Sequence, residues 1–256
     1  MNAQKDALIG STGFVGQALL AQRPFGAGYH STDIAAIEGR QFGRIVCAGV
    51  NAVKWWANAN AEADLAAIQR LIRHLDRAET DRFVLISTID VYAAPVGVDE
   101  RDVVPEPGLQ PYGMHRAILE DWVRRRFPQH HVIRLPALFG PGLKKNALFD
   151  LLHDNRLEHI DPASRFQWYP LDRLADDIDC VQALGLPLVN LVTEPVGMAD
   201  LQRRFFPKRI LGGQSQPTAY DVRTRHGAAF GGGAGYALGA EAVWGAMGRF
   251  VAAHRP

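Results

Sequence analysis

A glycine-punctuated turn near the amino terminus limits the folds open to this chain more than any other feature. The apolar residues 7–9 are typical of a buried strand, and the pattern that starts at Phe14 is typical of a helix. Gly10, Gly13 and Gly16 lie between them or at the helix start. A strand that passes directly into a helix in this way predicts an α/β fold.

Each glycine of this turn has a separate expected use. Gly10 allows a tight turn, Gly13 lets a phosphate approach the backbone, and Gly16 lets the helix lie close to its strand. Free N–H groups and the positive helix end then face one point, which favours an anionic pyrophosphate. The alternative is an ordinary strand-to-helix turn. The predicted cofactor contacts here are Gly10, Thr12, Gly13, Phe14, Val15 and Gly16.

The GxxGxxG spacing resembles that of the short-chain dehydrogenase/reductase superfamily, specifically its extended branch that modifies sugar nucleotides. The resemblance implies a Rossmann-type doubly wound parallel sheet with a small C-terminal substrate-binding lobe. It also implies NAD or NADP as the cofactor. The predicted division is a dinucleotide-binding core over residues 1–140, with a returning strand and helix near 165–192, and a mainly substrate-binding lobe over 141–256.

Composition narrows the classes of partner. The 256 residues include 28 basic and 27 acidic side chains, so nothing favours a nucleic-acid or membrane partner. Cys47 and Cys180 are the two cysteines, which excludes a disulfide framework and fits a reducing cytoplasm. No apolar run reaches the roughly 18 residues needed to span a bilayer, and no signal-peptide pattern is visible. The histidines lack metal-ligand spacing, so no metal is expected. A homodimer is left open as the assembly.

Asp33 bears on the choice between NAD and NADP. An acidic residue about 20 positions after the glycines often accepts hydrogen bonds from the adenosine ribose, which favours NAD. Alternatively, Asp33 corresponds to the superfamily's later aspartate near the adenine, or it is a surface-turn or capping residue. Ser31 and Thr32 could equally receive a 2′-phosphate, so the preference stays open.

The next strand, residues 45–48, leads into a turn of small residues. Ala48 and Gly49 are similar to the superfamily's Ala-Ala or Ala-Gly turn, where the cofactor's second ribose approaches. In the superfamily, the segment after such a turn usually borders the substrate. The resemblance therefore makes Lys54 and Trp55 candidate substrate contacts. Adjacent tryptophans on a loop could stack on a ring, or one could belong to the core and be covered by the other.

A continuous apolar strand is predicted at residues 82–86, and two hydroxyl residues follow it at the end of the sheet where a ligand is expected. Ser87 and Thr88 follow this strand, and parallel sheets bind ligands at the carboxyl ends of their strands. Residues 87–92 are similar to the superfamily's Ser-Thr-Asp-x-Val-Phe signature. The resemblance makes Thr88 the catalytic hydroxyl and Ser87 a cofactor contact.

Residues 112–116 resemble the superfamily's YxxxK motif, but Arg116 replaces the lysine. Tyr112 and Arg116 would share one helix face. The resemblance implies that Tyr112 exchanges a proton with the substrate while a neighbouring cation lowers its pKa. Arginine keeps the charge but is larger and cannot relay a proton as lysine can. The alternative for Tyr112 is an ordinary aromatic residue at a helix start.

Three further candidates lie beyond a second buried-type strand at residues 131–136. Pro136, at its exit, resembles a cofactor contact, and Asn146 starts a helix that suits a diphosphate. Trp168 is a candidate substrate contact. The resemblance as a whole implies an NAD(P)-dependent oxidoreductase, epimerase or dehydratase that acts by hydride transfer on a sugar or nucleotide sugar. The competing hypothesis is a dinucleotide-binding sensor or scaffold with little catalysis, which Arg116 makes credible.

Overall fold

The computed structural model describes residues 5–104 and 107–254, and the chain forms two compact units. Unit 1 contains Met1–Ala93, Asp102–Arg134 and Leu174–Val189. Unit 2 contains Ala94–Arg101, Leu135–Arg173 and Asn190–Pro256. The chain therefore leaves unit 1 and returns to it over Leu174–Val189.

Unit 1 is built on a six-stranded sheet with the order β2-β1-β3-β4-β5-β9. The β1/β2, β1/β3 and β3/β4 pairs are parallel. The sheet is the Rossmann-type arrangement predicted from the sequence, and that prediction is confirmed. Its strands are β1 (Asp6–Ile9), β2 (Ala27–Tyr29), β3 (Gln41–Cys47), β4 (Glu79–Thr88), β5 (His130–Leu135) and β9 (Leu188–Asn190).

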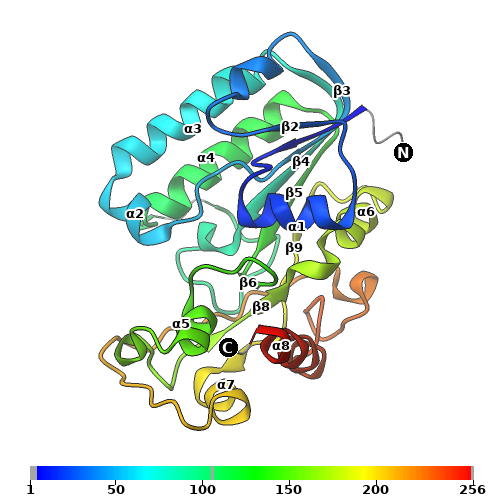
Figure 1. Ribbon diagram of the computed structural model, residues 1–256. Helices are drawn as coiled ribbons and strands as arrows, with labels where there is room; N and C mark the ends of the chain where they lie inside the picture. The colour runs from blue at the N-terminus through cyan, green and yellow to red at the C-terminus, as the bar shows by residue number, and fades with distance from the viewer. Residues whose placement is uncertain (1–4, 105–106, 255–256) are drawn as a thin grey trace. The chain divides into compact units, whose positions relative to one another are not determined.

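Helices cover both faces of this sheet, with α3 and α4 on one face and α1 and α6 on the other (Figure 1). The stripe Ile68, Leu71 and Leu75 of α3 is buried in the core beside the apolar strands. Burial of such a stripe is the main stabilising contribution of an amphipathic helix. The helices are α1 (Phe14–Gln22), α2 (Lys54–Ala59), α3 (Ala61–Leu75), α4 (Pro111–Arg126) and α6 (Leu174–Ala183), with 3-10 turns η2 (Ile34–Ile37) and η3 (Ile89–Val91).

The two adjacent tryptophans lie on a helix, so the expectation of a loop was wrong. Trp55 and Trp56 belong to α2, a six-residue helix that ends before α3 begins. Trp55 is 72% exposed, whereas Trp56 is half-buried. The small residues that precede Lys54 form the turn, and the tryptophans fall in the first helical turn after it.

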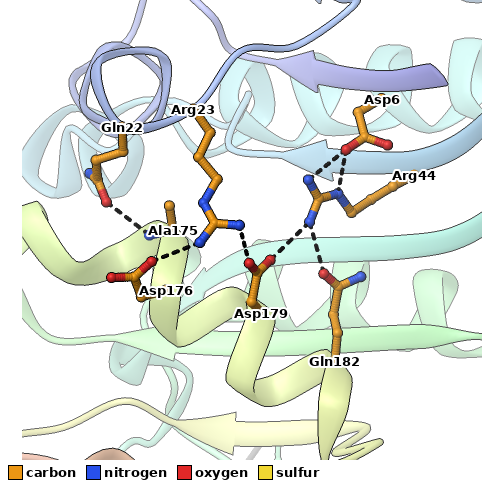
Figure 2. A network of polar contacts seen from close by, with 8 residues as sticks. All are labelled: Asp6, Gln22, Arg23, Arg44, Ala175, Asp176, Asp179 and Gln182. Atoms are coloured by element: carbon orange, nitrogen blue, oxygen red, sulfur yellow. Dashed lines mark hydrogen bonds and ion pairs between the residues drawn. The ribbon is translucent and has the colours of Figure 1, made fainter. Parts of the chain in front are cut away.

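A polar network holds α6 against β1, β3 and the end of α1 (Figure 2). The buried Arg44 of β3 donates to Asp6 at 2.5 Å and to Asp179 of α6 at 3.3 Å. Asp179 also pairs with Arg23, which follows α1. A buried charge is tolerated only when paired in this way. The network fixes the helix that returns from unit 2 onto the Rossmann sheet.

Unit 2 has its own apolar core around Phe139, Leu148, Trp168 and Val243. Two short sheets contribute to it: β6 (Ala137–Phe139) pairs with β8 (Trp168–Pro170), and β7 (Arg165–Phe166) pairs with β10 (Val196–Gly197). Its helices are α5 (Ala147–His153), α7 (Met198–Phe205) and α8 (Ala240–His254), with 3-10 turns η4 (Leu157–His159), η5 (Leu171–Arg173) and η6 (Gly227–Phe230).

The described residues lack two kinds of feature. In residues 5–104 and 107–254, no helix combines the length and hydrophobicity that a bilayer crossing requires. Within the same residues, no group of three or more His, Cys, Asp or Glu side chains is arranged to hold a metal ion.

Candidate functional site

The glycine turn is packed tightly against the end of β3. Gly10 has a φ of +84°, which L side chains rarely adopt, and a Cβ atom there would lie 2.4 Å from the Ala48 carbonyl oxygen. A Cβ atom at Gly16 would lie 2.1 Å from the Gly10 carbonyl oxygen. Protein packing alone therefore requires glycine at both positions. The predicted contacts Ala48 and Gly49 lie directly beside this turn.

Gly13 differs from Gly10 and Gly16, because fewer protein atoms lie in the space that its side chain would occupy. A Cβ atom at Gly13 would meet a single neighbour, the Gly10 carbonyl oxygen at 3.2 Å, and its φ of −78° suits any residue. Gly13 is the N-cap of α1, has no side-chain cap hydrogen bond, and no acidic side chain occupies the first turn. The backbone N–H groups at the start of the nine-residue helix α1 thus face a space that no capping side chain occupies. The turn fits a pyrophosphate.

Asp33 lies just beyond the carboxyl end of β2 and is held by His30. Its Oδ1 accepts the His30 backbone N–H at 2.6 Å, and its Oδ2 lies 3.1 Å from His30 Nε2. Thr32 Oγ1 lies 2.9 Å from His30 Nδ1 on the other side of the ring. The carboxylate therefore stands at the sheet edge where the glycine turn also lies, and its contact with a ribose stays a prediction.

Ser87 directs its hydroxyl group toward a buried acid. Ser87 Oγ donates to Glu120 Oε1 at 2.6 Å. Glu120 pairs with Arg134 of β5 at 2.6 Å, and Arg134 also donates to the Tyr92 hydroxyl at 2.7 Å. Glu120 and Arg134 are each 1% exposed. This network fixes the end of β4, where Thr88 is the last residue.

The structure brings the side chains of Thr88 and Tyr112 together. The Thr88 hydroxyl is hydrogen-bonded to the Tyr112 phenol, and its oxygen also accepts the Asp90 backbone N–H at 3.1 Å. Tyr112 begins α4, and its own backbone N–H donates to Asn58 Oδ1 of α2 at 2.9 Å. The position of Tyr112 is thus set from two elements besides its helix.

Arg116 lies under Tyr112 but is bound to a carboxylate. Its guanidinium carbon is 4.0 Å from the centre of the Tyr112 ring. Its Nη1 lies 2.5 Å from Asp64 Oδ2, its Nη2 lies 3.0 Å from Asp64 Oδ1, and Nη2 also donates to the Asn51 carbonyl oxygen. His115 Nδ1 lies 2.7 Å from the same carboxylate. Arg116 is 4% exposed, and both of its Nη atoms donate to acceptors of the protein.

The pKa of Tyr112 differs from the expectation. Burial raises the pKa of Tyr112, and Asp90 raises it further. Arg116, the Thr88 hydrogen bond and Lys54 lower it, but they do not offset burial, and the pKa lies above its ordinary value. The cation at position 116 therefore lowers the pKa of Tyr112 as the resemblance implies, but burial raises this pKa more, because the site is desolvated.

Sequence reasoning missed the two acids that organise the site. Asp64 occupies the stripe of α3 that continues at Ile68, Leu71 and Leu75, and Glu120 occupies the buried face of α4 below Arg116. A carboxylate on an otherwise apolar helical stripe was the available signal, because a charge is rarely buried without a partner. The identity of each partner was not visible in the sequence.

The remaining candidates Pro136, Asn146 and Trp168 fall in unit 2. Asn146 caps α5, with Oδ1 accepting the N–H groups of Leu148 and Phe149 at 3.1 Å, while its Nδ2 donates to the Leu138 carbonyl oxygen. Trp168 is 1% exposed, and its Nε1 has no hydrogen-bond partner. Pro136 joins β5 to β6. Their contacts with cofactor or substrate stay predictions.

Comparison with known proteins gives one family match in sequence. Residues 40–156 match the sequence model of the NAD dependent epimerase/dehydratase family. No curated protein matches the chain in sequence. The matched segment contains Thr88, Tyr112 and Arg116, whereas the glycine turn lies before it. The resemblance inferred from the sequence is confirmed, and the family's name agrees with the predicted NAD or NADP cofactor.

Solved structures share the fold at low sequence identity. MoeE5 in complex with UDP-glucose and NAD has a TM-score of 0.66 at 15% identity, covering 86% of this chain and 90% of that chain. UDP-N-acetylglucosamine 4-epimerase from Methanobrevibacter ruminantium has a TM-score of 0.68 at 10% identity, covering 87% and 90%. The dTDP-glucose 4,6-dehydratase DesIV from Streptomyces venezuelae, with NAD and DAU bound, has 0.66 at 16% identity, covering 85% and 87%. These similarities establish the fold.

Proposed function

We propose that this chain is an NAD(P)-dependent enzyme that transfers a hydride at a sugar carbon of a nucleotide sugar. The observation that carries the proposal is the hydrogen bond between Thr88 and Tyr112 at the carboxyl end of β4. The glycine turn follows β1 at the same edge of the parallel sheet. Ligands of open α/β sheets bind at this edge, so a cofactor and an acid/base pair would meet there.

The glycine turn would hold the cofactor. Backbone N–H groups at the start of α1 would bind its pyrophosphate at Gly13, with Ala48 and Gly49 close to the turn and Asp33 at the end of β2. When bound, NAD or NADP supplies the acceptor or donor of the hydride.

Tyr112 would move the proton and Thr88 would orient the substrate oxygen. In the oxidative direction, the Tyr112 phenolate would accept the proton of a sugar hydroxyl and become the phenol; in the reductive direction, the phenol would give its proton to the carbonyl oxygen and become the phenolate. Thr88 donates a hydrogen bond at the same point. The raised pKa of Tyr112 keeps the phenol protonated near neutral pH, which suits donation to a carbonyl oxygen.

The structural neighbours support the substrate class. MoeE5 is described in complex with UDP-glucose or UDP-glucuronic acid, and DesIV is a dTDP-glucose 4,6-dehydratase. Trp55, which is 72% exposed at the start of α2, offers an indole surface for stacking. Epimerase, dehydratase and reductase reactions share the Thr88 and Tyr112 machinery, and the proposal includes all three.

A second function, a cofactor-binding sensor with little catalysis, is favoured by one observation. Arg116 is held by Asp64 in a buried pair, so its charge is compensated and both of its Nη atoms already have acceptors in the protein. A site of this kind could bind the dinucleotide without driving efficient proton transfer.

The test separates these functions. NADH and NADPH binding is measured by fluorescence titration, and turnover is measured with UDP-glucose, UDP-N-acetylglucosamine and dTDP-glucose. The enzyme proposal expects binding, turnover of a nucleotide sugar, and a loss of about 10² to 10⁴ in kcat for Tyr112→Phe with unchanged cofactor affinity. Cofactor binding without turnover of any of the three sugars supports the sensor. Equal turnover by Tyr112→Phe and its parent rules out the proposed chemistry.

A further inference from the structure

The short helix α2 presents two side chains to the acid/base site. Lys54 and Asn58 are four residues apart and therefore share one face of the helix. Asn58 Oδ1 accepts the Tyr112 backbone N–H at 2.9 Å, and Lys54 Nζ lies 2.7 Å from Asp90 Oδ1. One helix face thus contacts both the start of α4 and the η3 turn.

The η3 turn is pressed against the start of α4. A Cβ atom at Gly113, the residue after Tyr112, would lie 2.0 Å from the Asp90 carbonyl oxygen. The Asp90 backbone N–H is also capped by Thr88 Oγ1, the group that hydrogen-bonds to Tyr112. The Asp90 backbone is therefore held against the start of α4, and the charges of Asp90 and of the Lys54 ammonium bound to it both act on the Tyr112 phenol.

The two cations around Tyr112 differ in their freedom. Arg116 is buried in a bidentate pair with Asp64, and a guanidinium does not lose its proton in proteins. The Lys54 side chain is 46% exposed and the Asp90 side chain is 20% exposed. A partly exposed pair contributes little stability and exchanges readily, and a lysine ammonium can release a proton to water.

We propose that Lys54, held in place by Asp90, is the adjustable cation that sets the ionisation of Tyr112 in this chain, the role for which the resemblance uses residue 116. The inference rests on the proposed function of Tyr112 as the acid/base group. It changes the earlier expectation for Lys54, which was substrate binding. When Lys54 turns from Asp90 toward the phenol, the phenolate gains a cation, and when it pairs with Asp90, the phenol keeps its proton.

The charged groups that face Tyr112 come from four elements. Lys54 lowers its pKa from α2 and Asp90 raises it from η3, so the two residues of the pair act in opposite directions. Arg116 lowers it from α4, with its charge compensated by Asp64 of α3 and with His115 on the same carboxylate. Replacing Lys54 or Asp90 therefore changes the balance, while the buried cluster below stays intact.

The experiment compares pH profiles of variants. Lys54→Met should raise the apparent pKa of kcat in the oxidative direction by roughly one pH unit, Asp90→Asn should lower it, and Lys54→Arg should leave it within a few tenths of a unit of the parent. Lys5→Met is the matched control, because Lys5 is an exposed lysine at the opposite end of the sheet.

A second measurement does not depend on turnover. The phenolate absorbance of Tyr112 is followed against pH as the difference between each protein and its Tyr112→Phe counterpart, with circular dichroism confirming the fold. The titration midpoints of the phenolate absorbance should follow the same order as the pKa values from kcat, with Lys54→Met above the parent and Asp90→Asn below it. An increase in KM for Lys54→Met with both midpoints equal to those of Lys5→Met would overturn the inference and return Lys54 to substrate binding. Loss of turnover in Tyr112→Phe would leave the proposed function standing in that case.

Discussion

Arg116 and Asp64 meet in a bidentate ion pair between α4 and α3, with Nη1 to Oδ2 at 2.5 Å and Nη2 to Oδ1 at 3.0 Å. The pair lies beneath the Tyr112 ring, which the guanidinium contacts face-on. The side chain to which the resemblance assigns the cation beside the phenolate is therefore also a buried support for the residue that carries the proposed chemistry.

Neutralising Asp64 should destabilise the fold. Asp64→Asn leaves Arg116 buried without its counter-charge, and we expect the free energy of unfolding to fall by about 3–5 kcal/mol in urea denaturation. Glu62→Gln is the matched control, because Glu62 is an exposed acid in the same first turn of α3. Equal losses in the two variants would show that Asp64 acts through the helix dipole only.

The same pair predicts how stability depends on pH. Burial raises the pKa of Asp64, but hydrogen bonds from Arg116 and His115 lower it more, and the pKa lies below its ordinary value. Because the folded pKa is depressed, the contribution of Asp64 is fully present above the unfolded pKa of about 3.9 and is lost as pH falls through the lower folded pKa. Urea denaturation at descending acidic pH should show a shallower decline for Asp64→Asn than for its parent.

The features that could be predicted from the sequence are those that neighbouring residues determine. The strand, glycine turn and helix over residues 6–22 follow from neighbouring residues, since glycine spacing and apolar runs determine them without distant partners. The Thr88 and Tyr112 encounter was also predictable, because the motifs of the resemblance already specify it. The parallel sheet then followed from buried-type strands that alternate with helices.

Distant pairings could not be predicted. Periodicity shows that Asp64 faces the core, but its partner Arg116 lies 52 residues away in the sequence. The Ser87 hydroxyl was assigned to the cofactor, whereas Glu120, 33 residues later, accepts its hydrogen bond. Which buried groups compensate one another depends on the tertiary fold, and hydrophobic patterns contain no information about it.

The glycine turn offers a test of which glycine serves the ligand. Gly13→Ala places a methyl group 3.2 Å from the Gly10 carbonyl oxygen and into the expected pyrophosphate position, so we expect a folded protein with at least roughly tenfold weaker NADH binding. Gly16→Ala is the contrasting variant, because its Cβ would lie 2.1 Å from the Gly10 oxygen and should destabilise the fold. Thermal denaturation and fluorescence titration measure the two effects. Unchanged NADH affinity in folded Gly13→Ala would refute the site.

Ser87 can be assigned by separating stability from binding. Ser87→Ala removes a hydroxyl that donates to buried Glu120 at 2.6 Å, and we expect a loss of about 1–3 kcal/mol in the free energy of unfolding. NADH affinity should stay within about twofold of the parent, because replacing a residue that does not contact the ligand changes binding only slightly. A large loss of affinity with unchanged stability would restore Ser87 to the cofactor site.

The last prediction concerns the choice between NADH and NADPH. The Asp33 carboxylate is fixed at the end of β2 by the His30 backbone N–H and ring, so its negative charge stands where the adenosine ribose is expected. We expect the parent to bind NADH more tightly than NADPH, because the carboxylate repels a 2′-phosphate. Asp33→Asn keeps an oxygen for the His30 N–H but removes the charge, and should raise NADPH affinity by roughly tenfold, which corresponds to about 1.4 kcal/mol. Asp81→Asn, an exposed acid in the first half of β4, should leave the ratio of the two affinities unchanged. Equal affinities of the parent for NADH and NADPH in fluorescence titrations would show that Asp33 is a turn residue and does not select the cofactor.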